Sequence, residues 1–259
     1  MTRVIAITNQ KGGVGKTTTC VNLGATLVET GYRVLVIDFD PQGNATSGSG
    51  VDKHQIQADV RGLLLGESSF ADTCLRRTEA GYDLLPSDIQ LTEAEVGLVN
   101  QTRAAFRLKQ MIDPHLEVYD FVLIDCPPAL SMLTINGLVA AHSVIIPMQC
   151  EFYALEGVAA LMQTIEQVRA THNSALVIDG VLRTMYDPRT SLTRQVSQQL
   201  EQFFGDKVFK TVIPRNVRLA EAPSYGLPVL RYDRLSKGAL SYLALAAELR
   251  QRLRTKEAA

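Results

Sequence analysis

Short apolar runs recur along the chain and alternate with longer segments whose apolar residues are spaced as in amphipathic helices. Most of the runs are continuous stretches of Val, Ile and Leu, which is typical of strands in a parallel sheet that is buried on both faces. They occupy residues 4–7, 34–37, 82–85, 121–124, 143–148, 176–184 and 208–213. Helical spacing is found at residues 19–30, 59–65, 87–99, 102–116, 152–170 and 237–254. This order predicts an α/β fold with right-handed crossovers, in which helices cover both faces of a mostly parallel sheet as a three-layer sandwich.

A glycine-rich segment separates the first apolar run from the first helix. Strand, turn and helix are the context in which a phosphate-binding loop occurs. The glycines let successive backbone N–H groups turn inward, and the N-terminus of the helix adds partial positive charge. We therefore expect nucleotide phosphates to contact Lys11, Gly12, Gly13, Val14, Gly15, Lys16, Thr17 and Thr18. Among these, Lys16 would reach the β- and γ-phosphates as a catalytic residue, and the Thr17 hydroxyl would bind Mg²⁺.

The loop departs from the common phosphate-loop pattern at two positions. Gln10 stands where the pattern has Gly, six residues before Lys16, and an additional lysine, Lys11, opens the loop. A lysine at this position lies on the opposite side of the loop from Lys16 and cannot easily turn back onto its own phosphates. We expect Lys11 to reach a nucleotide held by a second copy of the chain and to act there as a catalytic residue, as an arginine finger does in trans. The alternative is a glycine-rich turn with two solvated lysines.

Three aspartates stand at the ends of two apolar runs. Asp38 and Asp40 follow the second run, and Asp125 follows the run at 121–124. Because ligands of open α/β sheets bind at the carboxyl ends of the strands, these side chains are predicted beside the phosphate loop. One of the first two could serve the Mg²⁺ shell while the other orients the attacking water, and Asp125 would accept a hydrogen bond from a Mg²⁺-bound water. A turn with two solvated acids is the alternative for Asp38 and Asp40.

Together these stretches resemble the ParA/MinD family of P-loop ATPases, which have a deviant Walker A motif and belong to the SIMIBI class. The resemblance is carried by the KGGVGKTT loop, by the segment from Asp38 and by the Asp-x-Pro-Pro segment from Asp125, and the short chromosomal ParA (Soj) type is the most similar. It implies ATP as the nucleotide, Asp38 in the water shell of the metal and Asp40 as the residue that orients the hydrolytic water. It also implies that Pro214 and Asn216 lie against the adenine, where a plain loop is the alternative.

The composition suits one large domain. The chain has 259 residues, 46% of them hydrophobic, and no segment rich in Pro, Gly or Ser interrupts the pattern as a linker would. We expect a single ParA-type ATPase domain over residues 1–259 without an N-terminal helix-turn-helix domain. No signal-peptide pattern is evident, and no apolar run approaches the roughly 20 residues of a membrane span. The four cysteines lack C-x-x-C spacing, which favours reduced thiols in a cytoplasmic protein over an iron–sulfur ligand at Cys126.

The formal net charge of −1 conceals an asymmetry. Residues 1–182 carry 12 Lys and Arg against 20 Asp and Glu, whereas residues 183–259 carry 14 against 7. We expect the basic residues of the C-terminal third mostly in loops and at helix starts, where side chains reach phosphates. They include Arg183, Arg189, Arg194, Arg215, Arg218, Arg231, Arg234 and Lys237. The imbalance favours a DNA backbone contact for the group, and the resemblance points to Arg189 and Arg218, although for any single arginine a solvated charge is the alternative.

The resemblance therefore implies a Mg²⁺-dependent ATPase switch that partitions a chromosome or a plasmid. ATP would join two copies as a sandwich homodimer, with Glu151 facing the partner subunit or capping the next helix. The dimer would bind double-stranded DNA without reading its sequence. Two copies would neutralise twice as many phosphates, and each phosphate contributes about −0.9 to the slope of log affinity against log salt concentration. Slow hydrolysis, stimulated by a ParB-type centromere-binding partner, would dissolve the dimer. We expect a cytoplasmic, nucleoid-associated protein that does not bind membranes.

Two alternatives share the nucleotide motifs. A MinD-like switch would bind a membrane through the helix at 237–254 and the basic tail of that region, which contains Arg250, Arg252, Arg254 and Lys256. Packing of this helix into the core is favoured, since it offers Leu240, Leu243, Ala247 and Leu249 and the tail has no aromatic anchor. A metabolic enzyme on the same scaffold, such as a small-molecule kinase or an iron–sulfur reductase, would need an acceptor pocket or paired cysteines.

Overall fold

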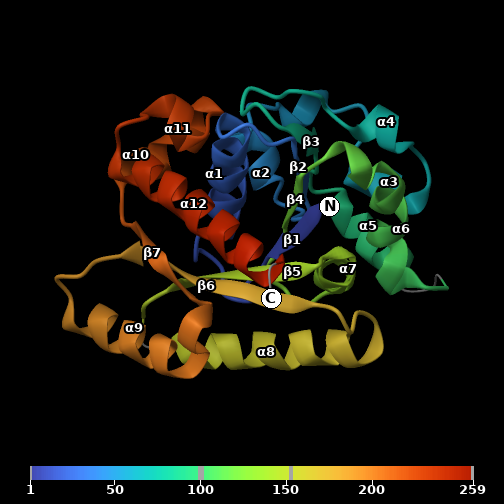
Figure 1. Ribbon diagram of the computed structural model, residues 1–259. Coiled ribbons are helices and arrows are strands. Elements are labelled where there is room, and N and C mark those ends of the chain that lie inside the picture. The colour runs from blue at the N-terminus through green and yellow to red at the C-terminus, as the bar shows by residue number, and fades with distance from the viewer. Residues whose placement is uncertain (1, 99–101, 152–153, 258–259) are drawn as a thin grey trace.

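One parallel sheet organises the chain, and the computed structural model describes residues 2–98, 102–151 and 154–257 of it. Within these residues, seven strands pair in the order β3-β2-β4-β1-β5-β6-β7 (Figure 1). They are β1 (Arg3–Ile7), β2 (Val34–Asp38), β3 (Asp83–Leu85), β4 (Phe121–Asp125), β5 (Ser143–Gln149), β6 (Val177–Tyr186) and β7 (Val208–Pro214). Because β1 lies between β4 and β5, the strand order reverses at β1, and the ligand crevice of an open α/β sheet is expected at its carboxyl end.

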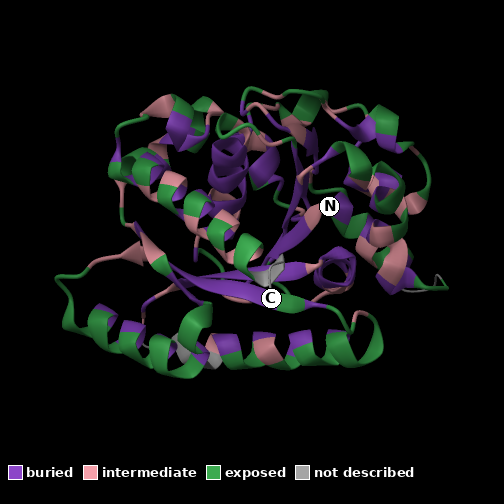
Figure 2. Cartoon of the chain, viewed as in Figure 1, coloured by how far each residue is buried: buried purple, intermediate pink, exposed green. Residues whose placement is uncertain are grey.

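Helices cover both faces of this sheet, which confirms the predicted three layers (Figure 1). One face packs against α1 (Lys16–Glu29), α11 (Val229–Tyr232) and α12 (Lys237–Glu257). The other packs against α3 (Val60–Leu65), α4 (Phe70–Thr73), α5 (Leu91–Leu98), α6 (Arg107–Ile112), α7 (Met132–Ala140), α8 (Ala154–Thr171) and α9 (Ser191–Phe204). Figure 2 shows the central strands in purple, buried between the two helical layers.

Shorter helical segments connect these elements at the edges of the sheet. Two of them are the α-helices α2 (Asn44–Gly48) and α10 (Val217–Glu221). The others are 3₁₀ turns at Lys53–Gln55, Ala104–Phe106, Asp113–Val118, Gly205–Lys207 and Ala222–Tyr225. The segment expected as one helix at 102–116 is therefore two 3₁₀ turns around α6. Pro114 has no backbone N–H to donate within an α-helix, and the chain continues past α6 as a 3₁₀ turn.

Several expected boundaries also differ. The helix expected at 87–99 begins at Leu91, because Asp88 accepts a hydrogen bond from the Gln90 N–H and closes a turn first. Its expected end at residue 99 lies outside the described residues, as do residues 152 and 153 at the start of the helix expected at 152–170. Helix α9 lies in the region that the charge pattern led us to treat as a basic surface, and it was not predicted.

The buried face of α12 is rotated from the one that the sequence indicated. Leu249 is buried as expected, but Leu240 is 51% exposed and Ala247 is exposed. The phenol of Tyr242 lies in the core, where its hydroxyl is 3.2 Å from the Thr19 hydroxyl in α1. The residues buried on this face are Ala239, Tyr242, Leu245, Ala246 and Leu249. Tyr242 with its hydroxyl partner thus points inward while Leu240 and Ala247 point outward, and Leu243 is partly buried against the core.

Candidate functional site

The residues predicted to bind nucleotide meet where β1, β2 and β4 end. In the pairing register, Asp125 at the end of β4 stands beside Ile7 of β1 on one side and Asp38 of β2 on the other. The glycine-rich loop leaves β1 at this edge and enters α1 at Lys16. The parallel register therefore brings the loop and the aspartates to one place, although the loop is far from Asp125 in the sequence.

The loop reaches α1 through two glycines in left-handed conformations. Gly13 and Gly15 have φ values of 73° and 86°, which glycine adopts without strain. A Cβ atom at Gly12 or Gly13 would meet no described atom within 4 Å, so the loop faces open space there. The Thr184 hydroxyl in β6 donates a 2.7 Å hydrogen bond to the Val14 carbonyl and holds the loop against the sheet. The free N–H groups at the start of α1 are therefore available to an anion.

Lys16 is nearly buried, with 7% of its surface exposed. Its Nζ donates a hydrogen bond of 3.1 Å to the Lys11 carbonyl oxygen. Burial lowers the pKa of Lys16, and the carboxylates of Asp125 and Asp40 oppose this shift. A phosphate oxygen in place of the carbonyl would offer the ammonium group a full negative charge, so this lysine is well placed to bind an anion.

Thr17 and Asp125 form a set of oxygen donors that suits Mg²⁺. The Thr17 hydroxyl donates to Asp125 Oδ2 at 2.7 Å, while Asp125 Oδ1 is buried and has no hydrogen-bond partner among the described residues. Burial, reinforced by repulsion from Asp38, raises the pKa of Asp125 well above its usual range. Such an unpartnered buried oxygen is costly unless a cation or a metal-bound water satisfies it. In the described part of the chain, no three His, Cys, Asp or Glu side chains gather as a metal cage.

Asp38 and Asp40 differ in how they are held. Asp38 is fully buried and its Oδ2 accepts two 2.7 Å hydrogen bonds, from the N–H and the hydroxyl of Thr46 in α2. Burial raises the pKa of Asp38 to about 6, although the hydrogen bonds from Thr46 oppose it. Asp40 is held mainly through its backbone, because Ser87 Oγ donates to its carbonyl at 2.7 Å, and its carboxylate accepts from the Gln42 N–H at 3.0 Å. The second aspartate is thus the one whose carboxylate has capacity for a further donor such as water.

Lys11 is engaged within its own chain. Its Nζ lies 2.6 Å from Glu151 Oε2, and the two side chains are 38% and 46% exposed. The Asn9 side chain supports the start of the loop by accepting from the Lys11 N–H at 3.0 Å and donating to the Pro147 carbonyl at 2.8 Å. Glu151, which was expected to face the partner subunit or to cap the next helix, thus pairs with the loop lysine of its own chain.

The residues expected near the adenine lie at the end of β7. Pro214 is the last residue of the strand and is partly exposed. Asn216 is the N-cap of α10, where its Oδ1 accepts a hydrogen bond from the Leu219 N–H at 3.3 Å. The Asn216 side chain therefore caps α10. Its second oxygen lone pair and its N–H groups remain available to bind a base.

The two arginines expected to bind DNA are exposed but paired with neighbouring acids. Arg189 forms a two-bond ion pair with Asp187, at 2.9 and 2.8 Å, and this arginine lowers the pKa of Asp187 to about 2. Arg218 lies 2.8 Å from Glu221 on its own helix and 3.2 Å from Asp233. A DNA phosphate would have to compete with these carboxylates.

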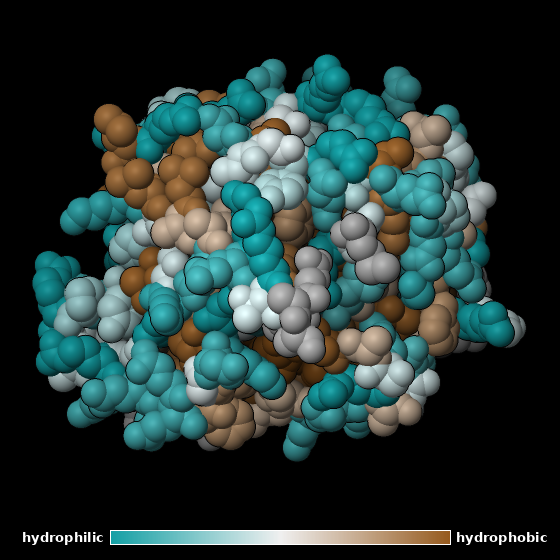
Figure 3. Space-filling model, viewed as in Figure 1, coloured by the Kyte–Doolittle hydropathy of each residue, from teal (hydrophilic) through white to brown (hydrophobic). Residues whose placement is uncertain are grey.

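The rest of the basic C-terminal third is less uniform than its composition indicates. Arg183 was expected on the surface but is buried in β6, where it donates to Ser197, Glu201 and the Phe209 carbonyl, so it is a structural residue. Apolar side chains are exposed in the same region. Figure 3 shows brown residues over α10 and α11, and the exposed ones of this region include Val217, Leu235 and Leu240.

The cysteines at 20, 74, 126 and 150 are buried and form no disulfide, and burial raises the pKa of the Cys126 thiol. No helix in the described part of the chain combines the length and the apolar character that crossing a bilayer demands.

Sequence reasoning missed four side chains that hold the site in shape. Asn9 and Thr184 position the loop, and Thr46 and Ser87 position the two aspartates. Thr184 and Ser87 act across long sequence separations, whereas Thr46 follows Asp38 by eight residues and Asn9 contacts both Lys11, two residues away, and the distant Pro147. Thr46 and Asn9 therefore carried a local signal, Thr46 as a hydroxyl residue near the start of a short helix and Asn9 as an Asn that accepts from the N–H two residues on.

Comparison with known proteins places this geometry among nucleotide-binding proteins. A family model described as an AAA domain matches residues 2–178. The sporulation initiation inhibitor protein Soj of Bacillus subtilis is 51% identical over 249 residues, which are 96% of this chain and 98% of that protein. The chromosome partitioning protein ParA of Caulobacter vibrioides is 48% identical over 258 residues, or 99% of this chain and 97% of that protein.

Solved structures of nucleotide-bound proteins are also similar to this chain. A cobyrinic acid a,c-diamide synthase from Mycobacterium smegmatis with bound ADP and magnesium is similar with a TM-score of 0.87 at 38% identity, over 99% of this chain and 97% of that one. The septum site-determining protein MinD of Pyrococcus horikoshii, complexed with Mg-ADP, has a TM-score of 0.79 at 26% identity, over 96% of each chain.

Proposed function

The chain is an ATPase of the ParA/MinD family, of the Soj/ParA chromosome-partitioning type, and we propose that it works as an ATP-dependent dimerising switch on DNA. Its identity to Soj and ParA, 51% and 48% over nearly the whole chain, exceeds its identity of 38% to the cobyrinic acid a,c-diamide synthase. We therefore favour partitioning over a metabolic reaction. The proposal treats residues 1–259 as one ATPase domain, because both apolar clusters pack on one sheet.

The nucleotide site is proposed to hold Mg²⁺ and ATP. The observation that carries this assignment is the unpartnered buried oxygen of Asp125, on the carboxylate that also binds the Thr17 hydroxyl. Bound Mg²⁺ would supply positive charge to the phosphates during hydrolysis. Thr17 would give it one oxygen ligand, and Asp125 and Asp38 would accept hydrogen bonds from its water shell.

The loop and Asp40 are proposed to do the remaining work on the triphosphate. Backbone N–H groups from Gly12 to Thr18, through Gly13, Val14 and Gly15, would bind phosphate oxygens, and Lys16 would exchange its bond to the Lys11 carbonyl for one to phosphate. Asp40 would accept a proton of the attacking water and so orient it toward the γ-phosphate. At the far end of the nucleotide, Pro214 would pack against the base and Asn216 would bind its amino edge.

Lys11 is proposed to complete the site of a second copy. In the single chain its ammonium group is paired with Glu151, but both side chains are more than a third exposed. Exposed ion pairs contribute only about 0–1 kcal/mol. A partner's triphosphate carries several charges in a site that dimerisation would close to water, so it can displace Glu151 at little cost.

The proposed dimer binds the DNA backbone through Arg189 and Arg218 of both copies. Both arginines are exposed. Phosphate contact needs charge but no base readout, and the number of contacts doubles on dimerisation, so DNA affinity should follow the nucleotide state. A ParB-type protein is the proposed partner that accelerates hydrolysis and so releases the DNA, which would make the chain nucleoid-associated.

One experiment tests the switch as a whole. DNA retention and particle mass are measured with a non-hydrolysable ATP analogue, with ADP and without nucleotide, at several salt concentrations. We expect a dimer and DNA binding only with the analogue, with an affinity that falls as salt rises. Protein that stays monomeric at micromolar concentration when saturated with analogue would refute the dimer. Analogue-dependent binding to liposomes without DNA binding would indicate a MinD-like membrane switch instead.

A further inference from the structure

Two glycines bring distant segments of the chain into backbone contact. Gly50 follows α2, and Gly226 ends the 3₁₀ turn Ala222–Tyr225. A Cβ atom on Gly226 would lie 2.8 Å from the Cα of Gly50, and a Cβ atom on Gly50 would lie 3.0 Å from the carbonyl oxygen of Gly226. Both residues are left-handed, with φ values of 82° and 66°. No side chain fits between them, so the two backbones touch directly.

One side of this contact leads to the nucleotide site. Thr46 in α2 donates two hydrogen bonds to Asp38, the aspartate at the end of β2. The end of α2 is continuous with the contact, because the Gly50 N–H donates to the Ser47 carbonyl at 3.1 Å and the Val51 N–H donates to the Thr46 carbonyl at 3.3 Å. A displacement of the Asp38 carboxylate would therefore move Gly50 with it.

The other side leads to the segment proposed to bind DNA. The Gly226 N–H donates to the Pro223 carbonyl at 3.0 Å, and the Leu227 N–H donates to the Ala222 carbonyl at 3.2 Å. This turn continues α10 without a break, since α10 ends at Glu221 and the turn begins at the next residue. Arg218 lies on α10, so the contact and the arginine belong to one hydrogen-bonded unit.

A second connection fixes the far end of that unit. The Asn22 side chain in α1 accepts from the Val229 N–H at 2.7 Å and donates to the Thr18 carbonyl at 2.7 Å. Residue 229 is thereby tied to the helix that follows the phosphate loop. Figure 1 shows α1, α10 and α11 gathered at the same end of the molecule. The segment 216–229 is thus held at its end by α1 and is contacted at Gly226 by Gly50, two residues after α2.

We propose that the Gly50–Gly226 contact transmits the state of the nucleotide site to α10 and so controls the presentation of Arg218. The inference rests on the proposed function, in which the ATP form binds DNA. Packed backbones cannot absorb a displacement as a rotating side chain can, so a shift of α2 is passed on. Arg218 pairs with Glu221 inside α10 and with Asp233 outside it, so movement of α10 weakens the second pair and leaves one carboxylate instead of two to compete with phosphate.

The test replaces Gly226 with alanine and uses a matched control. Gly226→Ala forces the two backbones apart and also places an alanine at positive φ. Gly205→Ala imposes at least as much conformational strain, because Gly205 combines a φ of 57° with a ψ of −126°, whereas Gly226 is in the left-handed helical region, but a Cβ at Gly205 would meet no described atom within 4 Å. We expect Gly226→Ala to lose about tenfold of the gain in DNA affinity that the ATP analogue produces, which is within the usual range of allosteric coupling. Gly205→Ala should keep the gain, and both variants should bind the analogue normally.

A second readout separates this inference from the proposed function. Hydrogen exchange at residues 217–227 is measured with and without the ATP analogue, in the absence of DNA. We expect an analogue-dependent change in the wild type and the Gly205→Ala variant but not in Gly226→Ala. If the wild type shows this change and yet never binds DNA, the proposed function fails and the coupling stands. If Gly226→Ala does not fold, Gly50→Ala disturbs the same contact from the other side, and a folded variant with wild-type coupling in both readouts overturns the inference.

Discussion

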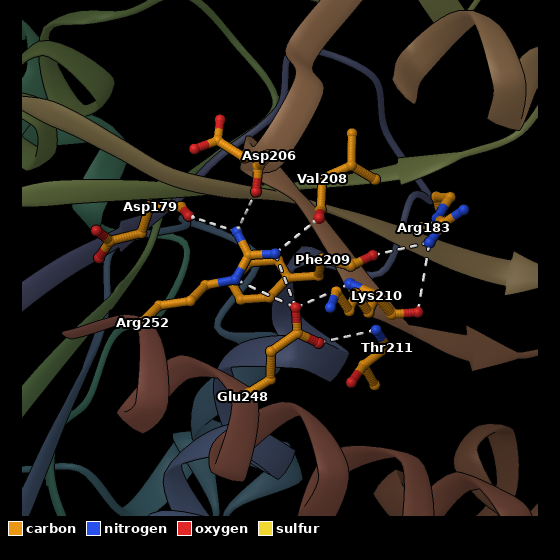
Figure 4. A network of polar contacts seen from close by, with 9 residues as sticks. All are labelled: Asp179, Arg183, Asp206, Val208, Phe209, Lys210, Thr211, Glu248 and Arg252. Carbon is orange, nitrogen blue, oxygen red and sulfur yellow. Dashed lines mark hydrogen bonds and ion pairs between the residues drawn. The ribbon is translucent and has the colours of Figure 1, made fainter. Parts of the chain in front are cut away.

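Strand β7 forms one edge of the sheet, and an ion pair on α12 binds to its backbone (Figure 4). The Glu248 carboxylate accepts from the N–H groups of Lys210 and Thr211, both at 2.8 Å, and from Arg252 at 2.7 Å. Arg252 in turn donates to the carbonyl oxygens of Asp179, Asp206 and Val208. The two side chains are only 14% and 19% exposed. We therefore predict that Glu248→Gln destabilises the protein although the substitution keeps the size of the side chain.

The magnitude follows from the hydrogen bonds. Glutamine offers one oxygen where glutamate offers two, so its NH₂ group must face either a β7 N–H or the guanidinium group of Arg252, and both are donors. Hydrogen bonds to charged groups contribute about 1.5–3 kcal/mol each, and a donor left without an acceptor adds to the loss. We expect the free energy of unfolding to fall by about 2–4 kcal/mol, which lowers the melting temperature of a protein of this size by about 5–12 °C.

The pH dependence distinguishes this cause from a general loss of packing. Burial alone would raise the pKa of Glu248, but the hydrogen bonds from Thr211, Lys210 and Arg252 outweigh it and leave the pKa below its usual value. A carboxyl group whose pKa is lower in the folded state stabilises the protein above its unfolded pKa of about 4.3, and this stabilisation is lost as the pH falls through the folded pKa. The difference between the wild type and Glu248→Gln should therefore be largest near neutral pH and should shrink in acid.

Thermal unfolding of the two proteins, followed by circular dichroism from neutral to acidic pH, measures this difference. The control is Glu166→Gln, which removes an exposed ion pair with Arg169 on the surface of α8. Exposed pairs on helices are worth about 0.3–0.5 kcal/mol, so the control should melt close to the wild type. The reasoning is refuted if Glu248→Gln melts like the control at neutral pH, or if its deficit is the same at every pH.

Four further predictions concern the site. Lys16→Ala should abolish ATP binding measured by calorimetry, and retained affinity would reject the assignment of the loop. Asp40→Ala should lengthen the lifetime of the ATP-bound dimer and suppress phosphate release, whereas normal turnover would remove its role with water. Arg218→Glu should weaken DNA retention and reduce the salt slope by about 2 for a dimer, with the dimer mass unchanged; undiminished retention would exclude this residue. Glu151→Gln should weaken the contact that holds Lys11 within its own chain. The analogue concentration needed for dimerisation should then fall by up to about fivefold, which corresponds to the free energy of an exposed ion pair. A weaker dimer would contradict the proposal that Glu151 and the partner's triphosphate compete for Lys11.

The sequence predicted those parts of the fold that depend on local pattern. Continuous apolar runs such as 34–37 have one stable place, inside a parallel sheet. The glycine-rich pattern at 11–18 is local in the sequence, although Thr184 holds the folded loop against the sheet. Helix α9 was missed although Val196, Leu200 and Phe204 mark its buried face, because three apolar residues among many polar ones resemble a solvated surface. In α12, leucine and alanine stand on several faces, and only contact with Thr19 decides that Tyr242 points inward.

The convergence of the loop and the aspartates at one edge of the sheet was predictable, but the ion pairs of the candidate residues were not. Lys11 and Glu151 are 140 residues apart, so no local pattern connects them. Arg189 and Arg218 are a different case, because Asp187 and Glu221 stand two and three residues away and the pairing could have been expected from the sequence. Net charge over a third of the chain does not reveal such pairing, which depends on the order of the charges.

The contact between Glu248 and β7 also limits how α10 can move. Glu248 holds Lys210 and Thr211, just before the strand ends at Pro214, so the start of the segment 216–229 is anchored to the sheet, as its end is anchored to α1 through Asn22. Because both ends of this segment are anchored, a displacement of its middle can be accommodated by rotation of α10. It follows that Glu248→Gln should reduce stability while leaving the nucleotide-dependent gain in DNA affinity intact as long as the protein is folded. Gly226→Ala should lose that gain in the folded protein, whatever the backbone clash costs in stability, and loss of the gain in Glu248→Gln as well would show that α10 moves together with β7 rather than against it.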